Sequence, residues 1–454
     1  MSIVLAAGAG TRMKSKLPKV LHKVTGISML EHVIDVTEEI QCDKKVVVIG
    51  HGADLVKEAT KHREIEFVLQ EEQLGTGHAV MQAERLIPDS GNVIALYGDT
   101  PLIRGESIKR FIQIHKENDY SASILTTEIE NPTGYGRIIR DENGKVIKIV
   151  EEKDANEIQK KVKEINSGIY CFKAGELKRS LRKLNNNNSQ GEYYLTDVIE
   201  ILRREGKEIG TYKLKDYTEI MGVNSRIQLA EAEKIMRKRI LDKLMEDGVT
   251  IIDPSNTYVD KSVKVERDTI LYPGTILAGN TEIGEDCIIG PNTHIEDSKI
   301  SDNVEIRNST IIESVIDSNT KVGPYAYLRP NSKLGKNVKI GDFVEVKNST
   351  IGDNSKASHL SYIGDGEVGK NVNIGCGVVF VNYDGKVKNK TIVKDNAFIG
   401  CNVNLVAPIT VEENGYVAAG STITKNVPEG ALAIARTKQQ NKEGWVSRKG
   451  LIKK

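Results

Sequence analysis

Hydrophobic residues follow one period in the first half of the chain and another in the second half. Up to about residue 224, short β-branched runs alternate with amphipathic segments. The runs predict strands at residues 3–7, 46–50, 66–69 and 93–97, and the segments predict helices at 29–40, 77–85 and 107–117. This alternation favours a mainly parallel, Rossmann-like α/β sheet whose ligands bind at the carboxyl ends of its strands.

Beyond about residue 249, aliphatic residues recur at every sixth position. One run consists of Ile316, Val322, Leu328, Leu334, Ile340 and Val346, and a second consists of Val393, Ile399, Leu405, Val411, Val417 and Ile423. A period of six matches neither an α-helix nor an alternating strand, and it is typical of a left-handed parallel β-helix built from hexapeptide repeats. Three repeats close one triangular coil, so we expect roughly ten coils.

Glycine often follows the aliphatic residue, as in Ile374-Gly375, where we expect it to permit a tight corner. The six-residue register breaks from residue 380 to residue 393, in a stretch that is rich in lysine. We expect this stretch to loop out of the β-helix. A charged segment at 225–248 predicts a helical linker between a domain at 1–224 and a domain at 249–454.

Composition narrows the class of protein. The 64 basic and 63 acidic side chains nearly cancel, which argues against a nucleic-acid-binding protein driven by bulk charge. The five cysteines are scattered and never form a Cys-x-x-Cys pair, so we expect reduced thiols in a cytoplasmic protein. The apolar start is too short for a signal peptide, and no run reaches the ~20 apolar residues of a membrane span.

The candidate chemistry of the first domain begins directly after the first predicted strand. Gly8 and Gly10 form a glycine turn there, and Arg12 and Lys19 follow. The turn lacks the Gly-Lys-Ser/Thr ending of a Walker P-loop and the third glycine of a dinucleotide fingerprint. Its backbone N–H groups can still cradle a phosphate, and the two cations add positive charge beside it.

Further motifs follow this turn along the chain, and together with it they resemble the motifs of a known family. They are Leu5–Met13 with Pro18-Lys19, Gln70–Ala79, Tyr97-Gly98-Asp99, Gly134–Arg137 and Gly222-Val223-Asn224. The first half resembles the sugar-1-phosphate nucleotidylyltransferases. With the repeat domain attached, the chain over residues 1–448 resembles the bifunctional N-acetylglucosamine-1-phosphate uridyltransferase / glucosamine-1-phosphate N-acetyltransferase family.

This resemblance implies a site for each substrate of uridylyl transfer. Arg12 and Lys19 would be catalytic and would stabilise charge on the triphosphate. Asp99 and Asn224 would hold Mg²⁺, which prefers oxygen ligands. The nucleotide and the sugar would contact Leu5, Ala6, Ala7, Gly8, Lys19, Gln70, Gly75, Thr76, Tyr97, Gly98, Asp99, Gly136, Glu151, Asn166 and Asn224.

The resemblance also implies an acetyl-transfer site in the repeat domain. His359 lies off the aliphatic period and should face outward, and it would be the base that removes a proton from the amine. Arg329, Lys347, Tyr362 and Asn373 would bind the sugar phosphate. The sugar or acetyl-CoA would further contact Cys376, Asn382, Tyr383, Cys401, Ala419 and Arg436.

Two of these positions depart from the family pattern. Cys376 stands where the family usually has alanine, and Cys401 stands where it usually has serine, which leaves one contact to coenzyme A in doubt. The family also implies a homotrimer with acetyl-transfer sites at its seams. The basic tail with Lys438 and Lys442 would either reach a neighbouring site or remain solvated.

The expected function is therefore bifunctional. Acetyl transfer from acetyl-CoA to glucosamine 1-phosphate would precede uridylyl transfer from UTP, with release of pyrophosphate, and would supply precursors of peptidoglycan and lipopolysaccharide. One alternative is a single-activity nucleotidylyltransferase whose β-helix only oligomerises or binds an effector. A non-catalytic regulatory subunit is a third reading, which the intact Arg12, Lys19 and Asp99 disfavour. Small molecules, and neither nucleic acid nor membrane, are the expected partners.

Overall fold

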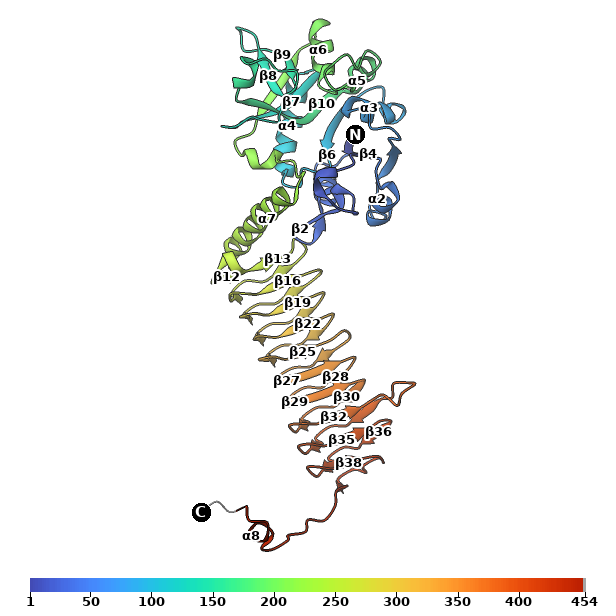
Figure 1. Cartoon of the computed structure of the whole chain (residues 1–454), viewed down its shortest axis with the longest axis vertical. Coiled ribbons are helices and arrows are strands. Elements are labelled where there is room, and N and C mark those ends of the chain that lie inside the picture. The colour runs from blue at the N-terminus through green and yellow to red at the C-terminus, as the bar shows by residue number, and fades with distance from the viewer. Residues whose placement is uncertain (452–454) are drawn as a thin grey trace. The chain divides into compact units, whose positions relative to one another are not determined.

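The computed structural model describes residues 1–451 and consists of two compact units, one ending at Met236 and one beginning at Arg237 (Figure 1). Each unit has its own hydrophobic core. Between residues 1 and 451, no helix combines the length and the apolar character that a membrane crossing requires.

The first unit is built around a nine-stranded sheet with the strand order β11-β7-β10-β6-β1-β4-β5, and β8 and β9 extend from β10. The strands are β1 (Ser2–Ala6), β4 (Lys45–Ile49), β5 (Glu66–Leu69), β6 (Asn92–Tyr97), β7 (Ala122–Glu128), β8 (Arg137–Arg140), β9 (Val146–Val150), β10 (Glu164–Lys173) and β11 (Ile209–Lys213), with a separate hairpin of β2 (Lys23–Val24) and β3 (Ile27–Ser28). The predicted parallel pairing is confirmed for β1, β4, β5 and β6, whereas β10 runs antiparallel to β6 and β7.

Helices cover both faces of this sheet because successive side chains of a strand point to opposite faces. In β1, Ile3 and Leu5 pack into the core beneath α3, α5 and α6, while Val4 and Ala6 pack against α1, α2 and α4. The helices are α1 (Met29–Glu39), α2 (Ala53–Ala59), α3 (Thr76–Gln82), α4 (Gly105–Glu117), α5 (Ala174–Leu181) and α6 (Asp197–Arg204). Helix α1 begins at a capping box in which Ser28 and Glu31 satisfy each other's backbone N–H groups.

A long charged helix, α7 (Arg226–Glu246), occupies the segment where the sequence predicts a helical linker. Its first residues, including Ala232, pack within the first unit, and Leu241 belongs to the core of the second unit. The boundary between the two compact units falls inside this helix.

The second unit is a three-sided parallel β-helix of short strands. A 19-stranded sheet wraps around two sides, and a nine-stranded sheet forms the third. The strands are β12 (Thr250–Ile251), β13 (Tyr258–Val259), β14 (Lys264–Val265), β15 (Ile270–Leu271), β16 (Ile276–Ala278), β17 (Glu282–Ile283), β18 (Ile288–Ile289), β19 (His294–Glu296), β20 (Lys299–Ile300), β21 (Glu305–Ile306), β22 (Thr310–Ile312), β23 (Val315–Ile316), β24 (Lys321–Val322), β25 (Tyr327–Leu328), β26 (Lys333–Leu334), β27 (Lys339–Lys347), β28 (Thr350–Ile351), β29 (Lys356–Gly364), β30 (Gly366–Val368), β31 (Asn373–Ile374), β32 (Val379–Val381), β33 (Thr391–Val393), β34 (Phe398–Ile399), β35 (Asn404–Val406), β36 (Ile409–Val411), β37 (Tyr416–Val417), β38 (Thr422–Ile423) and β39 (Leu432–Ala433), and a short helix, α8 (Trp445–Arg448), follows.

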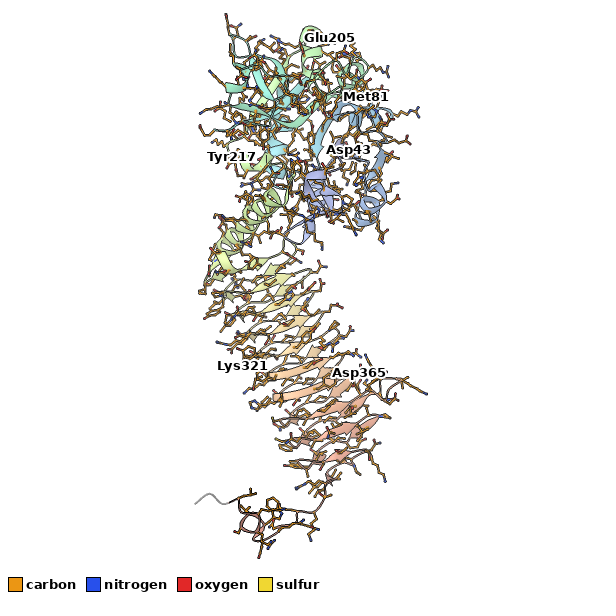
Figure 2. All side chains as sticks on the ribbon, in the orientation of Figure 1. Asp43, Met81, Glu205, Tyr217, Lys321 and Asp365 are labelled. Atoms are coloured by element: carbon orange, nitrogen blue, oxygen red, sulfur yellow. The ribbon has the colours of Figure 1, made fainter. Side chains whose placement is uncertain are left out.

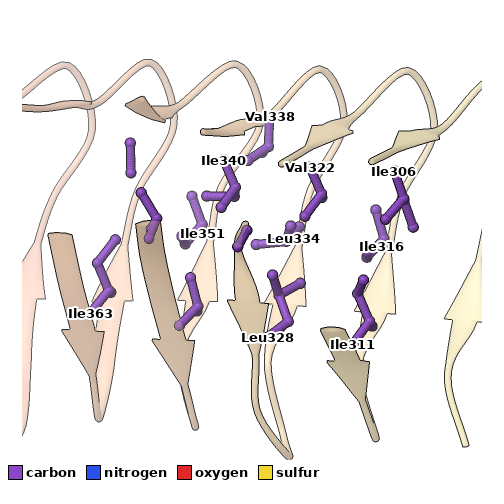
Figure 3. Packing of buried hydrophobic residues seen from close by; sticks show 14 of the residues in the cluster. Ile306, Ile311, Ile316, Val322, Leu328, Leu334, Val338, Ile340, Ile351 and Ile363 are labelled. Carbon is purple, nitrogen blue, oxygen red and sulfur yellow. The ribbon is translucent and has the colours of Figure 1, made fainter. Parts of the chain in front are cut away.

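The six-residue period of the sequence corresponds to one inward side chain for each side of each coil. Every member of the two predicted runs is buried, and these side chains stack into a continuous interior core (Figure 3). Alternate residues such as Lys321 point outward into solvent (Figure 2). Side chains therefore fill the interior of the β-helix, so any binding or catalytic site of this unit lies on its outer surface.

The predicted loop is confirmed. The chain leaves β32 at Val381, returns at Thr391, and is held by an antiparallel bridge between Tyr383 and Lys388. Figure 1 shows this segment projecting sideways from the β-helix. The expected role of the glycines is confirmed for Gly290 and Gly323, whose φ angles are 101° and 104°. It is wrong for Gly375, which has an ordinary φ and is required for another reason: a Cβ there would lie 2.6 Å from the backbone nitrogen of Cys401 on the next coil. Asparagine and aspartate, such as Asn371 and Asn396, supply most of the left-handed corners.

Candidate functional site

A cavity of about 270 Å³ lies at the carboxyl ends of β1 and β6. The two strands are parallel, with Leu5 opposite Tyr97, so their ends reach the same edge of the sheet. The chain leaves β1 through Gly8, and Gly10 turns it back with a φ of 60°. Most of the residues that the sequence assigns to the nucleotide line this cavity, namely Leu5, Ala6, Ala7, Gly8, Lys19, Gln70, Gly75, Thr76, Tyr97 and Asp99. Gly98 is buried at the end of β6, where its N–H donates to the carbonyl of Leu5.

The ammonium of Lys19 lies between two oxygen atoms from distant parts of the chain. Nζ donates to Oδ2 of Asp99 at 2.5 Å and to Oδ1 of Asn224 at 3.0 Å. A cation is thus held by a carboxylate and an amide oxygen, which are donor types that Mg²⁺ takes from proteins. No group of three or more His, Cys, Asp or Glu side chains within residues 1–451 is arranged to hold a metal ion. The pair therefore fits a Mg²⁺ ion that takes its other ligands from phosphates and water.

A second cavity of about 450 Å³ shares Thr76, Tyr97 and Asp99 with the first. It also contains Arg12 and the residues that the sequence assigns to the sugar, namely Gly136, Glu151, Asn166 and Asn224. The α-carbon of Gly136 faces this space, because a Cβ there would lie 3.4 Å from Oε1 of Glu151 and 3.5 Å from Cβ of Asn166. The absence of a side chain at Gly136 therefore keeps the cavity open.

Hydrogen bonds and burial fix the polar groups around this second cavity. The amide of Asn166 donates to the Tyr170 hydroxyl at 2.6 Å, and its oxygen accepts from the N–H of Gly168 at 3.0 Å. Burial, reinforced by the charges of Asp154 and Asp197, raises the pKa of Glu151. A half-buried, partly desolvated carboxylate of this kind can accept hydrogen bonds from the hydroxyl groups of a sugar.

Two features of these cavities differ from the sequence-based expectation or were missed by it. Arg12 lines the second cavity and not the first, although the sequence places it beside the triphosphate. Glu192 lines both cavities but follows a polar loop and carries no motif of its own. Only the fold brings it there, through the contact between Gly75 and Tyr193: a Cβ on Gly75 would lie 2.6 Å from the Tyr193 carbonyl.

In the second unit, outward side chains form a column along one corner of the β-helix. Asp342 and His359 are register partners in β27 and β29. The same register continues to later coils, because the N–H of Gly377 donates to the carbonyl of Leu360 and the N–H of Asn402 donates to the carbonyl of Cys376. We call this set the corner column, and it consists of Asp342, His359, Cys376, Cys401 and Ala419.

The first two members of the corner column form an oriented pair. Nδ1 of His359 lies 2.7 Å from Oδ1 of Asp342. The hydrogen bond to His359 lowers the pKa of the Asp342 carboxyl below its usual range, so this group stays ionised. A carboxylate accepts only, so Nδ1 carries the proton and Nε2 is the basic nitrogen. Asp342 belongs to none of the sequence motifs, and the signal that could have found it is its place 17 residues before His359, the length of one coil here.

Several of the predicted phosphate-binding residues gather on the neighbouring side of the β-helix. Arg329 pairs with Glu345 at 2.8 Å, and Glu345 is the register partner of Tyr362. Lys347 ends β27 close to Lys388 of the projecting loop, and its ammonium lowers the pKa of Lys388, both as a hydrogen-bond donor to the neutral amine and as a neighbouring positive charge. Two ammonium groups this close repel each other, so a doubly charged phosphate between them would be favourable.

Asn382 joins this group from the base of the projecting loop. Its amide donates to the Tyr362 hydroxyl at 3.4 Å and to Oδ2 of Asp365, labelled in Figure 2, at 2.5 Å. Asn373 instead lies on the preceding side, in register with Phe398. The corner column therefore separates Asn373 from Tyr362.

The remaining predicted residues are exposed. Tyr383 is 58% exposed on the projecting loop. Arg436 follows β39 and approaches Gly420, the neighbour of Ala419 in the corner column. His359 has a side chain that is 61% exposed, so a single chain presents the corner column on an open surface.

Three family models and one solved structure match parts of the chain. The family model described as nucleotidyl transferase matches residues 1–225, the model described as bacterial transferase hexapeptide (six repeats) matches residues 262–297, and the model described as GMPPB C-terminal domain matches residues 311–430. Among solved structures, UDP-glucose pyrophosphorylase complexed with UDP-glucose matches with a TM-score of 0.44 and 18% identity, over 52% of this chain and 98% of that one.

Curated relatives match over the whole length. The bifunctional protein GlmU of Alkaliphilus metalliredigens is 60% identical over 453 residues, which cover 100% of this chain and 99% of that protein. The bifunctional protein GlmU of Clostridioides difficile is 60% identical over 99% of this chain and 97% of its own length. The corresponding protein of Alkaliphilus oremlandii is 61% identical over 100% and 99%. The chain therefore belongs to the family of the bifunctional protein GlmU, the uridyltransferase and acetyltransferase family that its motifs resemble.

Proposed function

We propose that the chain makes UDP-N-acetylglucosamine in two steps at two separate sites. Residues 1–224 carry uridylyl transfer, residues 249–454 carry acetyl transfer, and residues 225–248 link them. Acetyl-CoA first acetylates glucosamine 1-phosphate, and UTP then uridylylates the product. The observation that carries this proposal is the oriented His359–Asp342 pair beside a cluster of phosphate-binding side chains, because a β-helix that only oligomerises needs no such pair.

For uridylyl transfer, the first cavity holds UTP and the second holds N-acetylglucosamine 1-phosphate. A phosphate oxygen of the sugar attacks the α-phosphorus of UTP, and pyrophosphate leaves. Lys19 and Arg12 neutralise the charge that develops on the phosphates. Gly136, Glu151 and Asn166 shape the sugar pocket. The nucleophile is already an anion, so this half-reaction needs no general base.

Asp99 and Asn224 would hold Mg²⁺ in this site. When bound, the ion would supply positive charge to the triphosphate and help to orient it. The Lys19 ammonium lies between the same two oxygens, which supports the proposal of a cation at this position. Lys19 is then the residue that contributes a second, permanent positive charge to the same phosphates.

For acetyl transfer, the amine of glucosamine 1-phosphate attacks the thioester carbonyl of acetyl-CoA. Nε2 of His359 removes the proton from the amine, and coenzyme A leaves as its thiol. Asp342 holds the imidazole in the tautomer with the proton on Nδ1. Arg329, Lys347, Tyr362 and Asn373 bind the sugar phosphate. Coenzyme A follows the corner column and its neighbours, with contacts to Cys376, Asn382, Tyr383, Cys401, Ala419 and Arg436.

The open acetyl-transfer site is completed in a homotrimer. Beside the corner column, Tyr325, Phe343 and Leu360 expose 60%, 59% and 59% of their surface. The rings of Tyr325 and Phe343 stack with centroids 5.6 Å apart and planes within 9°. Such a strip of large apolar side chains favours burial against another copy of the chain. The five free cysteines, together with the need for UTP and acetyl-CoA, support a cytoplasmic location.

One experiment tests the division of labour. The full-length protein is assayed separately for release of coenzyme A thiol and for release of pyrophosphate, and His359→Ala is compared with the parent. We expect the variant to lose thiol release and to keep pyrophosphate release. Loss of both activities would contradict two independent sites. Absence of thiol release in the parent would favour the alternative, a single-activity nucleotidylyltransferase with a structural β-helix.

A further inference from the structure

Cys376 and Cys401 lie opposite each other on consecutive coils. Ile374 and Ile399 are register partners, and each cysteine follows its isoleucine by two residues. Backbone hydrogen bonds hold the two coils together on both sides of the cysteines, from the N–H of Gly375 to the Ile399 carbonyl at 2.8 Å and from the N–H of Asn402 to the Cys376 carbonyl at 2.7 Å. The two cysteines therefore occupy matching positions in the turns that follow β31 and β34.

The spacing of consecutive coils brings such a pair within reach of a covalent bond. Neighbouring strands lie about 4.8 Å apart, and the α-carbons of a disulfide are usually about 4.4–6.8 Å apart. Both thiols are unpaired and exposed. Cys171 and Cys287 are buried and Cys42 is half-buried, so the pair at positions 376 and 401 holds the two exposed thiols of the chain.

The pair also has a chemical neighbour that favours reaction. His359 lies one coil from Cys376 in the corner column, since Ala357 and Ile374 are register partners two residues earlier. An imidazole one coil away can take up the proton that a thiol must lose before it attacks sulfur. The imidazole and the two thiols therefore lie at successive positions of the corner column, on the exposed surface of the β-helix.

We propose that Cys376 and Cys401 form a dithiol modification site that reacts with small disulfides and closes into a bond between the two residues. The acetyl-transfer site is thereby blocked while the first unit stays active. The inference about blocking rests on the proposed function, because it takes the corner column as the place of the thioester. The inference that the two thiols react with each other rests only on the register of the two coils.

The reaction proceeds by two thiol–disulfide exchanges. One cysteine thiolate attacks a sulfur of the small disulfide, a protein–ligand sulfur bond forms, and one ligand thiolate leaves with a proton. The second cysteine attacks the sulfur of the first, forms the bond between residues 376 and 401, and releases the second ligand thiol. Two protein thiols are oxidised, and one small disulfide is reduced to two thiols.

Coenzyme A disulfide is the small disulfide that this site fits best, because the same column is proposed to hold coenzyme A. Glutathione disulfide carries the same reactive bond without the nucleotide. The two reagents therefore separate recognition of coenzyme A from simple exposure of the thiols. Preference for the first, and protection by acetyl-CoA, identify the ligand class.

The test uses the reduced full-length protein, treated with each disulfide in turn. Intact-mass measurement and peptide mapping should find a Cys376–Cys401 bond and the loss of two hydrogen atoms. We expect thiol release from acetyl-CoA to fall by about tenfold or more, since the bond spans the place of the thioester, and to return on reduction. Pyrophosphate release should not change. Faster closure with coenzyme A disulfide than with glutathione disulfide identifies coenzyme A as the ligand, and equal rates would overturn that assignment.

Variants that each lack one cysteine of the pair separate the two thiol–disulfide exchanges. Cys401→Ser and Cys376→Ala should each stop at a mixed disulfide and gain the mass of one ligand thiol. Each variant is compared with its own untreated state, and Cys42→Ser serves as the matched control that should close like the parent. The proposal is overturned if mapping finds both thiols still reduced, or joined to other partners, after a treatment that modifies denatured protein.

The closing measurement also distinguishes this inference from the proposed function. If the protein shows thiol release that depends on His359 but the cysteines never pair, the dithiol inference fails and the proposed function stands. If the cysteines pair but the reduced protein never releases coenzyme A thiol, the proposed acetyl transfer fails, and with it the inference that pairing blocks it.

Discussion

Oδ1 of Asp342 lies 2.7 Å from Nδ1 of His359, and the two residues face each other across consecutive coils of the β-helix. Neither side chain is buried, since 40% of Asp342 and 61% of His359 are exposed. The pair is therefore positioned by strand register rather than by a packed pocket. Register is set by the interior aliphatic residues, so the stacking of the core determines the orientation of the imidazole.

The Asp342–His359 contact predicts that Asp342→Ala slows acetyl transfer without affecting uridylyl transfer. The imidazole loses the acceptor that fixes its tautomer, so we expect kcat for thiol release to fall by about tenfold with little change in KM. Asp342→Asn keeps an oxygen acceptor and should lose less. A matching loss in both variants, or a rise in KM without a fall in kcat, would speak against a positioning role. Steady-state kinetics of thiol and pyrophosphate release provide the measurement.

The contact between Lys19 and Asp99 predicts a loss of uridylyl transfer in Asp99→Asn. The variant keeps the shape of the side chain but removes the negative charge that would bind Mg²⁺. We expect kcat for pyrophosphate release to fall by about 100-fold or more and the Mg²⁺ concentration at half-maximal rate to rise. Asp89→Asn removes an exposed carboxylate, paired with Lys178, from the same unit and should behave like the parent. An unchanged Mg²⁺ requirement in Asp99→Asn would exclude Asp99 as a ligand.

The β-helix was predictable from sequence because one residue in six must fill a narrow interior. Polar residues in the interior would lose their hydration, so aliphatic residues recur at every sixth position of the sequence. The reason for Gly375 was not predictable, because this glycine is required by the approach of the next coil and not by its own φ. The sequence shows which residue is small but not which backbone lies beside it.

The residues of the candidate sites also include some that the sequence predicts and some that only the fold identifies. Gly8, Lys19 and Asp99 belong to motifs whose chemistry can be read along the chain, and the structure gathers them in one cavity. Glu192 and Asp342 contribute through contacts with distant segments. Their neighbours in sequence carry no chemical pattern, so only the fold could identify them.

The position of Gly136 predicts a specific defect in sugar binding. In Gly136→Ala the new methyl group would lie 3.4 Å from Oε1 of Glu151 and 3.1 Å from Cγ2 of Ile149, at the edge of the second cavity, which we propose holds the sugar. We expect KM for N-acetylglucosamine 1-phosphate to rise by about tenfold, because the pocket loses depth, while KM for UTP stays unchanged. Gly175→Ala, which lies in helix α5 away from the cavity, is the matched control. Equal increases in both KM values would contradict the assignment of the two cavities.

Asp197 predicts a pH dependence of stability. Burial raises its pKa from 3.8 to about 6, and the charges of Glu200 and Asp154 add to the effect. The folded chain therefore binds this proton more tightly than the unfolded chain, and stability decreases as the pH rises from about 4 to about 6. Asp197→Asn removes this cost, so its Tm should exceed that of the parent by a few degrees at pH 8 and match it at pH 4. Calorimetry at both pH values checks the sign, and an equal difference at both would refute it.

The exposed strip beside the corner column predicts that assembly and acetyl transfer fail together. Phe343→Glu places a charge where Tyr325 and Leu360 would be buried against another copy, so we expect the proposed trimer to dissociate into monomers. Thiol release should then fall by about tenfold or more, because the open site is no longer completed, and pyrophosphate release should persist. Val315→Glu introduces the same charge on another side of the β-helix, between the register partners Lys299 and Lys333, and should remain assembled and active. Light scattering combined with the two assays gives the answer, and a monomeric Phe343→Glu with full thiol release would place the acetyl-transfer site within a single chain.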